Sequence, residues 1–207
     1  QYLKTNNSFY SLDFLLSQHK GPMQYLIGGI VFLFSKDILN ESIYRIPFSI
    51  SNILSIIFLY LFLKNVTRSK SAAFFASLVF GVNGMIVAFG RIFQYQSFNL
   101  MFSFLSLYFY SNLEIIDEKK DQNYVIRNSL VGTFFFCLSV LSHWDAVFVT
   151  PYIVFMIFRN ILFNKRYSKE FKKRFVLFNS IFIIFLSAFY LLPYISHFKS
   201  SAENQEY

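Results

Sequence analysis

Residues 43–63 read IYRIPFSISNILSIIFLYLFL, an apolar segment with one charged side chain, Arg45, near its start. A helix needs about 20 apolar residues to cross the hydrocarbon core of a bilayer, and this segment has that length. Five further segments are long and apolar enough to cross as well: residues 72–90, 97–113, 124–142, 146–163 and 175–194. The sequence therefore predicts an all-α, polytopic membrane helix bundle with about six transmembrane helices.

The composition excludes an ordinary soluble protein. Hydrophobic residues make up 55% of the chain and charged residues 14%, whereas charged residues are about 25% of an average soluble domain. The net charge of +8 would also suit a nucleic-acid-binding protein, but in a membrane protein a basic excess usually lies in cytoplasmic loops. The single cysteine, Cys137, rules out an intrachain disulfide and a cysteine-based metal cluster for this chain.

The basic residues are distributed unevenly between the two ends of the apolar segments. The connectors near residues 64–70, 114–127 and 159–174 fall on one side of the membrane if all six segments cross. They hold 13 of the 19 basic residues, namely Lys64, Arg68, Lys70, Lys119, Lys120, Arg127, Arg159, Lys165, Arg166, Lys169, Lys172, Lys173 and Arg174. The positive-inside rule makes this side cytoplasmic, so the other connectors are expected to face outward.

A shorter apolar run, Met23 to Ser35, follows the polar tetrapeptide His19-Lys20-Gly21-Pro22. Runs of about 10 to 14 apolar residues are more often interfacial than spanning. We therefore expect a juxtamembrane helix on the outer face, with the tetrapeptide at the mouth of a functional site. If this run spanned instead, the charge distribution would still orient the other six segments.

The predicted organisation is one transmembrane domain over residues 1–207. It consists of an outer loop at 1–21, a juxtamembrane helix at 22–36, six transmembrane helices within 43–194 and an outer segment at 195–207. Pro47 is expected in the first turn of its helix, where its missing N–H is tolerated. Because the chain opens with Gln1, it is expected to be a fragment of a longer protein.

Three cations near the expected outer ends of the spans are candidates for binding a phosphate: Lys20, Arg45 and Arg91. Arginine suits bidentate contacts with an anion, and lysine supplies a point charge. The alternative is that these side chains extend from helix ends into lipid headgroups. For Arg45, contact with lipid headgroups carries about the same weight as phosphate binding. For Lys20, it carries less weight than phosphate binding.

Two polar groups lie in the other outer connectors. His143 and Asp145 flank Trp144 in a short connector, where they are expected to present both side chains outward as an acid-base pair or as two metal ligands. The alternative is an interfacial tryptophan with polar neighbours. Gln94 and Gln96 are candidates for hydrogen bonds to a sugar or an acceptor. No phosphate-binding loop, dinucleotide fingerprint, zinc-protease or serine-hydrolase motif occurs.

The order of these features resembles glycosyltransferase family 39, which includes the protein O-mannosyltransferases and the aminoarabinose transferases that act on lipid A. Residues 18–26, QHKGPMQYL, resemble the motif that leads from an outer loop into the juxtamembrane helix of that family. Residues 41–47, ESIYRIP, resemble its acidic turn and Arg-Leu-Pro start of the next span. The basic turn at 64–70 and Arg91 complete the series, which covers residues 11–151.

This resemblance implies a GT-C fold and a sugar donor linked to a polyprenyl phosphate, attacked by an acceptor hydroxyl of a protein, lipid or glycan on the outer face. It implies that Lys20 contacts the donor phosphate and that Arg45 and Arg91 support the loop or the anion. His19 stands where some members place a metal-binding carboxylate, so a divalent metal is an open possibility beside a structural histidine.

Two departures from the family pattern follow. The family often has an aspartate where this chain has Gln96, and its catalytic base lies upstream of the motif, so the base is expected before residue 1. Asp13 is not assigned the role of catalytic base.

The resemblance also implies a bacterial or archaeal cell membrane, membrane lipids as neighbours and no nucleic-acid partner. A polytopic transporter or lipid-linked flippase is the main alternative, and a noncatalytic membrane scaffold is a third.

Overall fold

The computed structural model describes residues 22–35, 40–92, 94–114, 122–186 and 188, and these residues form helices joined by turns. The helices are α2 (Met23–Ser35), α3 (Glu41–Thr67), α4 (Lys70–Val82), α5 (Gly84–Phe89), α6 (Gln96–Ser111), α7 (Gln122–Ser142), α8 (Thr150–Ile157) and α9 (Lys169–Leu186). A 3-10 turn, η2 (Trp144–Val149), precedes α8, and a π turn, η3 (Phe158–Leu162), follows it. The described part contains no β-strand, so the predicted all-α membrane helix bundle is confirmed.

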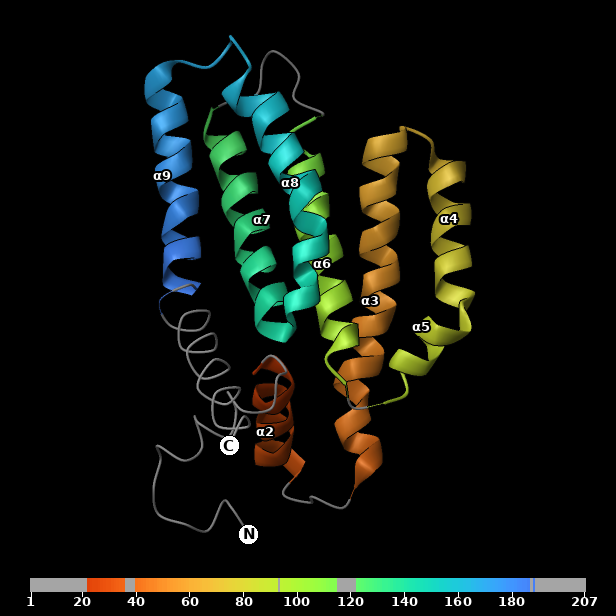
Figure 1. Cartoon of the computed structure of the whole chain (residues 1–207). Helices are drawn as coiled ribbons and strands as arrows, with labels where there is room; N and C mark the ends of the chain where they lie inside the picture. Colours follow the sequence, from red (N-terminus) through yellow and green to blue (C-terminus); the bar gives the residue numbers. More distant parts are fainter. Residues whose placement is uncertain (1–21, 36–39, 93, 115–121, 187, 189–207) are drawn as a thin grey trace, which may run out of the picture.

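The chain runs six times between the two ends of the bundle, through α3, α4 with α5, α6, α7, η2 to η3, and α9 (Figure 1). Three of these passes are long and apolar enough to cross a membrane: Glu41–Thr67, Gln122–Ser142 and Trp144–Leu162. The other three passes do not meet this requirement of length and apolar character. Asn83 divides the pass of α4 and α5, α6 has only 16 residues, and α9 begins with a strongly charged turn.

α6 is the centre of the packing. It lies against α3 on one side and α7 on the other, while α4 covers α3 and α9 covers α7 (Figure 1). Gly132 of α7 permits the close approach, because a Cβ there would lie 2.9 Å from the Tyr110 ring of α6. Small residues at helix contacts let backbones approach closely in membrane bundles.

A line of buried polar side chains, here called the polar seam, connects α6, α7 and α9. Its members are Asn99, Ser103, Ser106 and Tyr110 of α6, Ser129, Thr133 and Ser139 of α7, and Asn179 of α9. The Ser139 hydroxyl donates to Asn99 Oδ1 at 2.6 Å, and the Tyr110 and Thr133 hydroxyls lie 2.6 Å apart. Thr133 in turn donates to Asn179 Oδ1. These bonds satisfy polar groups that would otherwise lie in an apolar interior, and they join the three helices.

The pass predicted at 72–90 is not one continuous helix. Asn83 ends α4 and begins α5, and its Oδ1 accepts a hydrogen bond from the Met85 N–H at 3.0 Å. An asparagine side chain that bonds a nearby backbone group competes with the helix, which is why the chain bends here.

The expectation for Pro47 is wrong, because α3 begins at Glu41 and Pro47 lies inside it. Asn40 caps this helix, and its Oδ1 accepts from the Ile43 N–H at 3.4 Å. The polar first turn of α3 therefore extends the helix beyond the apolar segment that the sequence marks.

The described connectors at 64–70 and 159–174 and the start of α7 lie at one end of the bundle, the upper end in Figure 1. The start of α3, the turn after α5 and the turn after α7 lie at the opposite end, and α2 extends beyond it (Figure 1). The described arginines Arg45 and Arg91 belong to this lower end, which is the end that the charge distribution predicts to face outward.

Candidate functional site

The lower end of the bundle is built around a small apolar cluster of Phe48 from α3 with Phe98 and Met101 from α6. Ile27 of α2 packs against this cluster, so the short helix is attached to the bundle by side-chain contacts. Phe48 and Phe98 meet edge to face with ring centroids 5.0 Å apart, an arrangement that favours a fixed geometry. The polar groups around this cluster are therefore carried by rigid elements.

Three side chains hold the end of α5 through its backbone carbonyls. The Ser49 hydroxyl donates to the Gly90 carbonyl at 2.5 Å, and Asn52 Nδ2 donates to the Ile86 carbonyl at 3.0 Å. The Ser97 hydroxyl donates to the Phe89 carbonyl at 2.9 Å. We call these three bonds the α5 clamp. They satisfy carbonyls at a helix end, which is required wherever water is scarce.

Gly90 leaves room for the α5 clamp. A Cβ at this position would lie 2.7 Å from Asn52 Nδ2, a distance that real Cβ atoms essentially never show. The absence of a side chain lets the turn approach α3 closely enough for Ser49 to reach the Gly90 carbonyl. The next residue, Arg91, is thereby fixed relative to α3.

Arg45 and Arg91 emerge from the two backbone segments that this hydrogen bond joins. Ser49 lies four residues after Arg45 and so shares its helix face, while Arg91 directly follows Gly90. Arg45 forms an ion pair with Glu41 at 2.7 Å, and 43% of its side chain is exposed. Arg91 is exposed and has no acidic partner within the part of the chain that the structure describes. The two predicted cations therefore come to one corner of the bundle.

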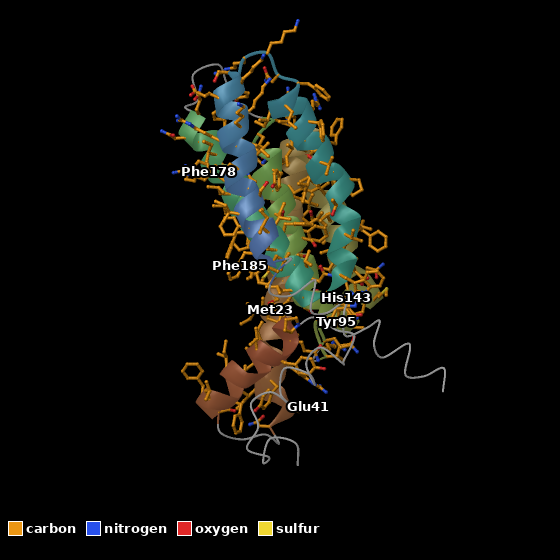
Figure 2. All side chains as sticks on the ribbon, turned by 60° about the vertical axis from the view of Figure 1, so that its left-hand side comes forward. Met23, Glu41, Tyr95, His143, Phe178 and Phe185 are labelled. Carbon is orange, nitrogen blue, oxygen red and sulfur yellow. The ribbon has the colours of Figure 1, made fainter. Side chains whose placement is uncertain are left out.

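The His143 connector meets the same end from α7. The His143 imidazole stacks on the Tyr95 ring, with centroids 4.0 Å apart and planes inclined by 12°, and Figure 2 shows both residues together at the lower end. The expected outward presentation of His143 is wrong, because its side chain is buried by this stack. Asp145 is 48% exposed and Trp144 is 64% exposed. The stack places the 94–96 turn beside the turn after α7.

Asp145 offers His143 two different contacts. Nδ1 of the imidazole lies 2.9 Å from Asp145 Oδ2 and 3.2 Å from the Asp145 backbone nitrogen. A bare Nδ1 accepts from the N–H, and a protonated Nδ1 donates to the carboxylate, so Asp145 can hold the ring in either state. Burial, and after it the negative charge of Asp145, raises the pKa of Tyr95 above its ordinary value.

The described residues contain no group of three or more His, Cys, Asp or Glu side chains that could hold a metal ion. His143 and Asp145 together supply two possible ligands. Gln94 and Gln96 are both partly buried, and within the described ranges the Gln96 Oε1 atom is buried without a hydrogen-bond partner. The amide of Gln96 at the start of α6 therefore has an accepting atom that the described side chains do not use.

The predicted residues His19 and Lys20 lie outside the described residues, as does Asp13. The described chain resumes at Pro22, whose carbonyl accepts from the Leu26 N–H at 3.0 Å to start α2. Met23 lies next to the lower end of the bundle in Figure 2, and α2 contacts both α3 and α7. The helix that follows the tetrapeptide thus begins at the same end as Arg45 and Arg91.

Ser49, Asn52 and Gly90 are structural parts of this site that the residue patterns did not single out. The available signal was spacing, since Arg45, Ser49 and Asn52 recur at four and three residues on one face of an otherwise apolar helix. Tyr95 was noticed only as part of a polar turn, because no pattern in the sequence pairs it with His143.

Residues 19–192 match the family model described as dolichyl-phosphate-mannose-protein mannosyltransferase. The chain belongs to this mannosyltransferase family. The match begins at His19, the first residue of the tetrapeptide, and it confirms the resemblance stated from the sequence. It supports a membrane glycosyltransferase of the GT-C type. Searches of curated proteins and of solved structures found no match.

Proposed function

We propose that this member of the mannosyltransferase family transfers a sugar from a polyprenyl-phosphate donor to an acceptor hydroxyl on the outer face of a bacterial or archaeal cell membrane. The observation that carries the proposal is the corner where the hydrogen bond from Ser49 to the Gly90 carbonyl joins the backbone segments that carry Arg45 and Arg91. Guanidinium groups at this position suit a phosphate whose polyprenyl tail remains in lipid. The family match makes a lipid-linked sugar the fitting class of donor.

The chemistry requires a base for the acceptor hydroxyl and cations for the departing phosphate. Arg91 is the best-placed described cation, because it is exposed and lacks an acidic partner within the ranges described above. Arg45 is oriented by its ion pair with Glu41, so it supports the anion as part of a pair. We assign direct phosphate contact to Lys20 and supporting contacts to Arg45 and Arg91.

The carboxylate base is proposed to come from a segment preceding residue 1, since the family places it upstream of the tetrapeptide motif. Gln94 and Gln96 are proposed to contact the sugar or the acceptor. His143 and Asp145 are proposed as a polar group beside them that could hold a metal ion if His19 or an upstream carboxylate joined them. These roles concern the full-length protein.

The distribution of charge favours this enzyme over a transporter. Ionisable residues in transporters often lie near the middle of the bilayer, where they mark the substrate path. Within the described passes, no Asp, Glu, Lys or Arg lies near the middle, and those at the lower end belong to turns or to the first five residues of a helix. The described charged residues therefore lie at the two ends of the bundle. This position suits the binding of a donor phosphate at the membrane interface.

The test uses membranes that contain the full-length protein and a panel of radiolabelled polyprenyl-phosphate sugars. We expect transfer from at least one donor, and we expect Arg91→Ala to reduce it at least tenfold, a loss of about 1.4 kcal/mol in transition-state stabilisation. Arg127→Ala, at the other end of the bundle, is the matched control and should leave transfer unchanged. Absence of transfer with every donor, or equal loss in both variants, would refute the proposal.

A further inference from the structure

The outward face of α9 carries two cations followed by a line of apolar side chains. At four-residue intervals, this face presents Lys169, Lys173, Leu177, Ile181 and Phe185, and all five are exposed. Residues four apart form a ridge that is inclined by about 26° to the helix axis, so this line runs obliquely across the exposed side of α9. Figure 2 shows Phe185 and the neighbouring Phe178 on the outer side of α9. We call this line the α9 stripe.

The first turn of α9 is held firmly from the inward side. Tyr167 stacks on Phe171 with ring centroids 4.6 Å apart, and both are buried together with Phe175 in the core. The Ser168 hydroxyl accepts a hydrogen bond from the Phe171 N–H at 3.2 Å. Because these contacts fix the rotation of the helix, Lys169 and Lys173 must point away from the bundle.

We propose that the α9 stripe binds an acidic phospholipid, with the headgroup phosphate at Lys169 and Lys173 and an acyl chain along Leu177, Ile181 and Phe185. Leu177 and Phe185 are separated by about 12 Å along the helix axis, given a rise of 1.5 Å per residue. That length is close to the depth of one leaflet of a hydrocarbon core about 30 Å thick. The stripe thus has the charge and the dimensions of one lipid molecule.

The charges at this end favour an anion over a neutral lipid. Within the described ranges, the ion pairs between side chains are Arg45 with Glu41, His143 with Asp145, and Arg159 with Glu114, so Lys169 and Lys173 form no ion pair there. Glu170 is the acidic residue in the first turn of α9, and the cations Lys169, Lys172, Lys173 and Arg174 outnumber it. Arg174 adds a third exposed cation next to Lys173. Clusters of basic residues beside a membrane helix attract anionic headgroups.

Basic residues at the end of a helix can serve only to orient a membrane protein, without binding a particular lipid. The outward face of α4 is an example with which the α9 stripe can be compared. Its outward face carries Lys70, Phe74, Leu78 and Val82 at the same four-residue intervals, all exposed, with one cation in place of two. Orientation depends on the number of basic residues on a side and not on their helix face. The α4 face is therefore a matched control for the α9 stripe.

The test is native mass spectrometry of the full-length protein after delipidation, with phosphatidylglycerol, phosphatidylcholine or glycerol phosphate added. We expect saturable binding of phosphatidylglycerol that weakens by about fivefold for each lysine removed, thus roughly 25-fold in Lys169→Gln/Lys173→Gln. Lys70→Gln and Lys169→Arg/Lys173→Arg should bind like the natural chain. Circular dichroism of each variant verifies that the helices remain formed.

Four results would overturn the inference. The first is equal affinity for phosphatidylcholine and phosphatidylglycerol, which would indicate bulk lipid. The second is unchanged binding in Lys169→Gln/Lys173→Gln, and the third is an equal loss in Lys70→Gln. The fourth is displacement of the lipid by glycerol phosphate at comparable concentration, which would show an anion site that makes no use of the apolar part of the stripe. None of these results depends on transferase activity.

Discussion

At the scale of single residues, Gly90 links packing to the proposed chemistry. Its lack of a side chain lets Asn52 and Ser49 reach the backbone at the end of α5, and Arg91 follows directly. The position of the cation that we propose to bind phosphate therefore depends on a residue that has no chemical function of its own. Two predictions belong to this scale.

Gly90→Ala should displace Arg91, because the new Cβ would lie 2.7 Å from Asn52 Nδ2. We expect a loss of about 1–3 kcal/mol in unfolding free energy, as for other overpacked sites, together with a raised KM for the lipid-linked donor. Thermal unfolding in detergent and transfer kinetics measure the two effects. Gly84→Ala is the matched control, since nothing lies within 4 Å of its added Cβ. An unchanged donor KM in Gly90→Ala would separate the turn from donor binding.

Lys20→Ala should abolish transfer without lowering the amount of protein in the membrane. The reason is that Lys20, which precedes the start of α2 by three residues, is the cation that we propose to contact the donor phosphate. Activity assays paired with immunoblots of the membrane fraction test this. Normal turnover in the variant would remove Lys20 from the proposed site.

At the scale of helices, the polar seam joins α6, α7 and α9 more specifically than apolar contacts do. Thr133 is its central member, because its hydroxyl meets Tyr110 on one side and Asn179 on the other. Buried hydroxyl and amide groups cost free energy when they lose their partners. The relative positions of these helices are therefore sensitive to single polar atoms.

Thr133→Val keeps the shape of the side chain and removes its hydroxyl, so it should leave Asn179 Oδ1 without its Thr133 donor. We expect an unfolding free energy lower by about 1–3 kcal/mol. Thr67→Val, at the exposed last residue of α3, is the control. It should change the unfolding free energy by at most about 0.5 kcal/mol. Denaturant or thermal titration of both variants in the same detergent compares them. Equal stability would show that the seam does not contribute to helix association.

At the scale of the whole molecule, the described basic connectors and the proposed site lie at opposite ends of the bundle (Figure 1). We expect a cysteine in place of Trp144 to react with a membrane-impermeant maleimide in intact cells. A cysteine in place of Lys165 should react only after permeabilisation. Both are made in a Cys137→Ser background, because Cys137 is the single cysteine of residues 1–207. The reversed labelling pattern would place the proposed site in the cytoplasm.

Composition and segment length were sufficient to predict the all-α membrane helix bundle, because apolar length is a strong physical requirement in lipid. The break at Asn83 was not predicted, since its cause is one side-chain hydrogen bond inside an apolar segment. Arg45 and Arg91 were chosen as candidates because charges at span ends are rare, and their proposed role stays a prediction. Their connection through Ser49 and Gly90 depends on contacts between residues 41 positions apart, which no local pattern contains.

The polar seam also bears on the order in which the nascent chain enters the bilayer. When α6 leaves the ribosome, Asn99, Ser103 and Ser106 have not yet met the α7 groups that they bond, namely Ser139 and the Gly132 carbonyl. A helix of this polarity is poorly retained by lipid on its own, since each unmatched polar group opposes its transfer. α6 and α7 are therefore expected to leave the translocon together as a helical hairpin, with their polar sides already facing each other.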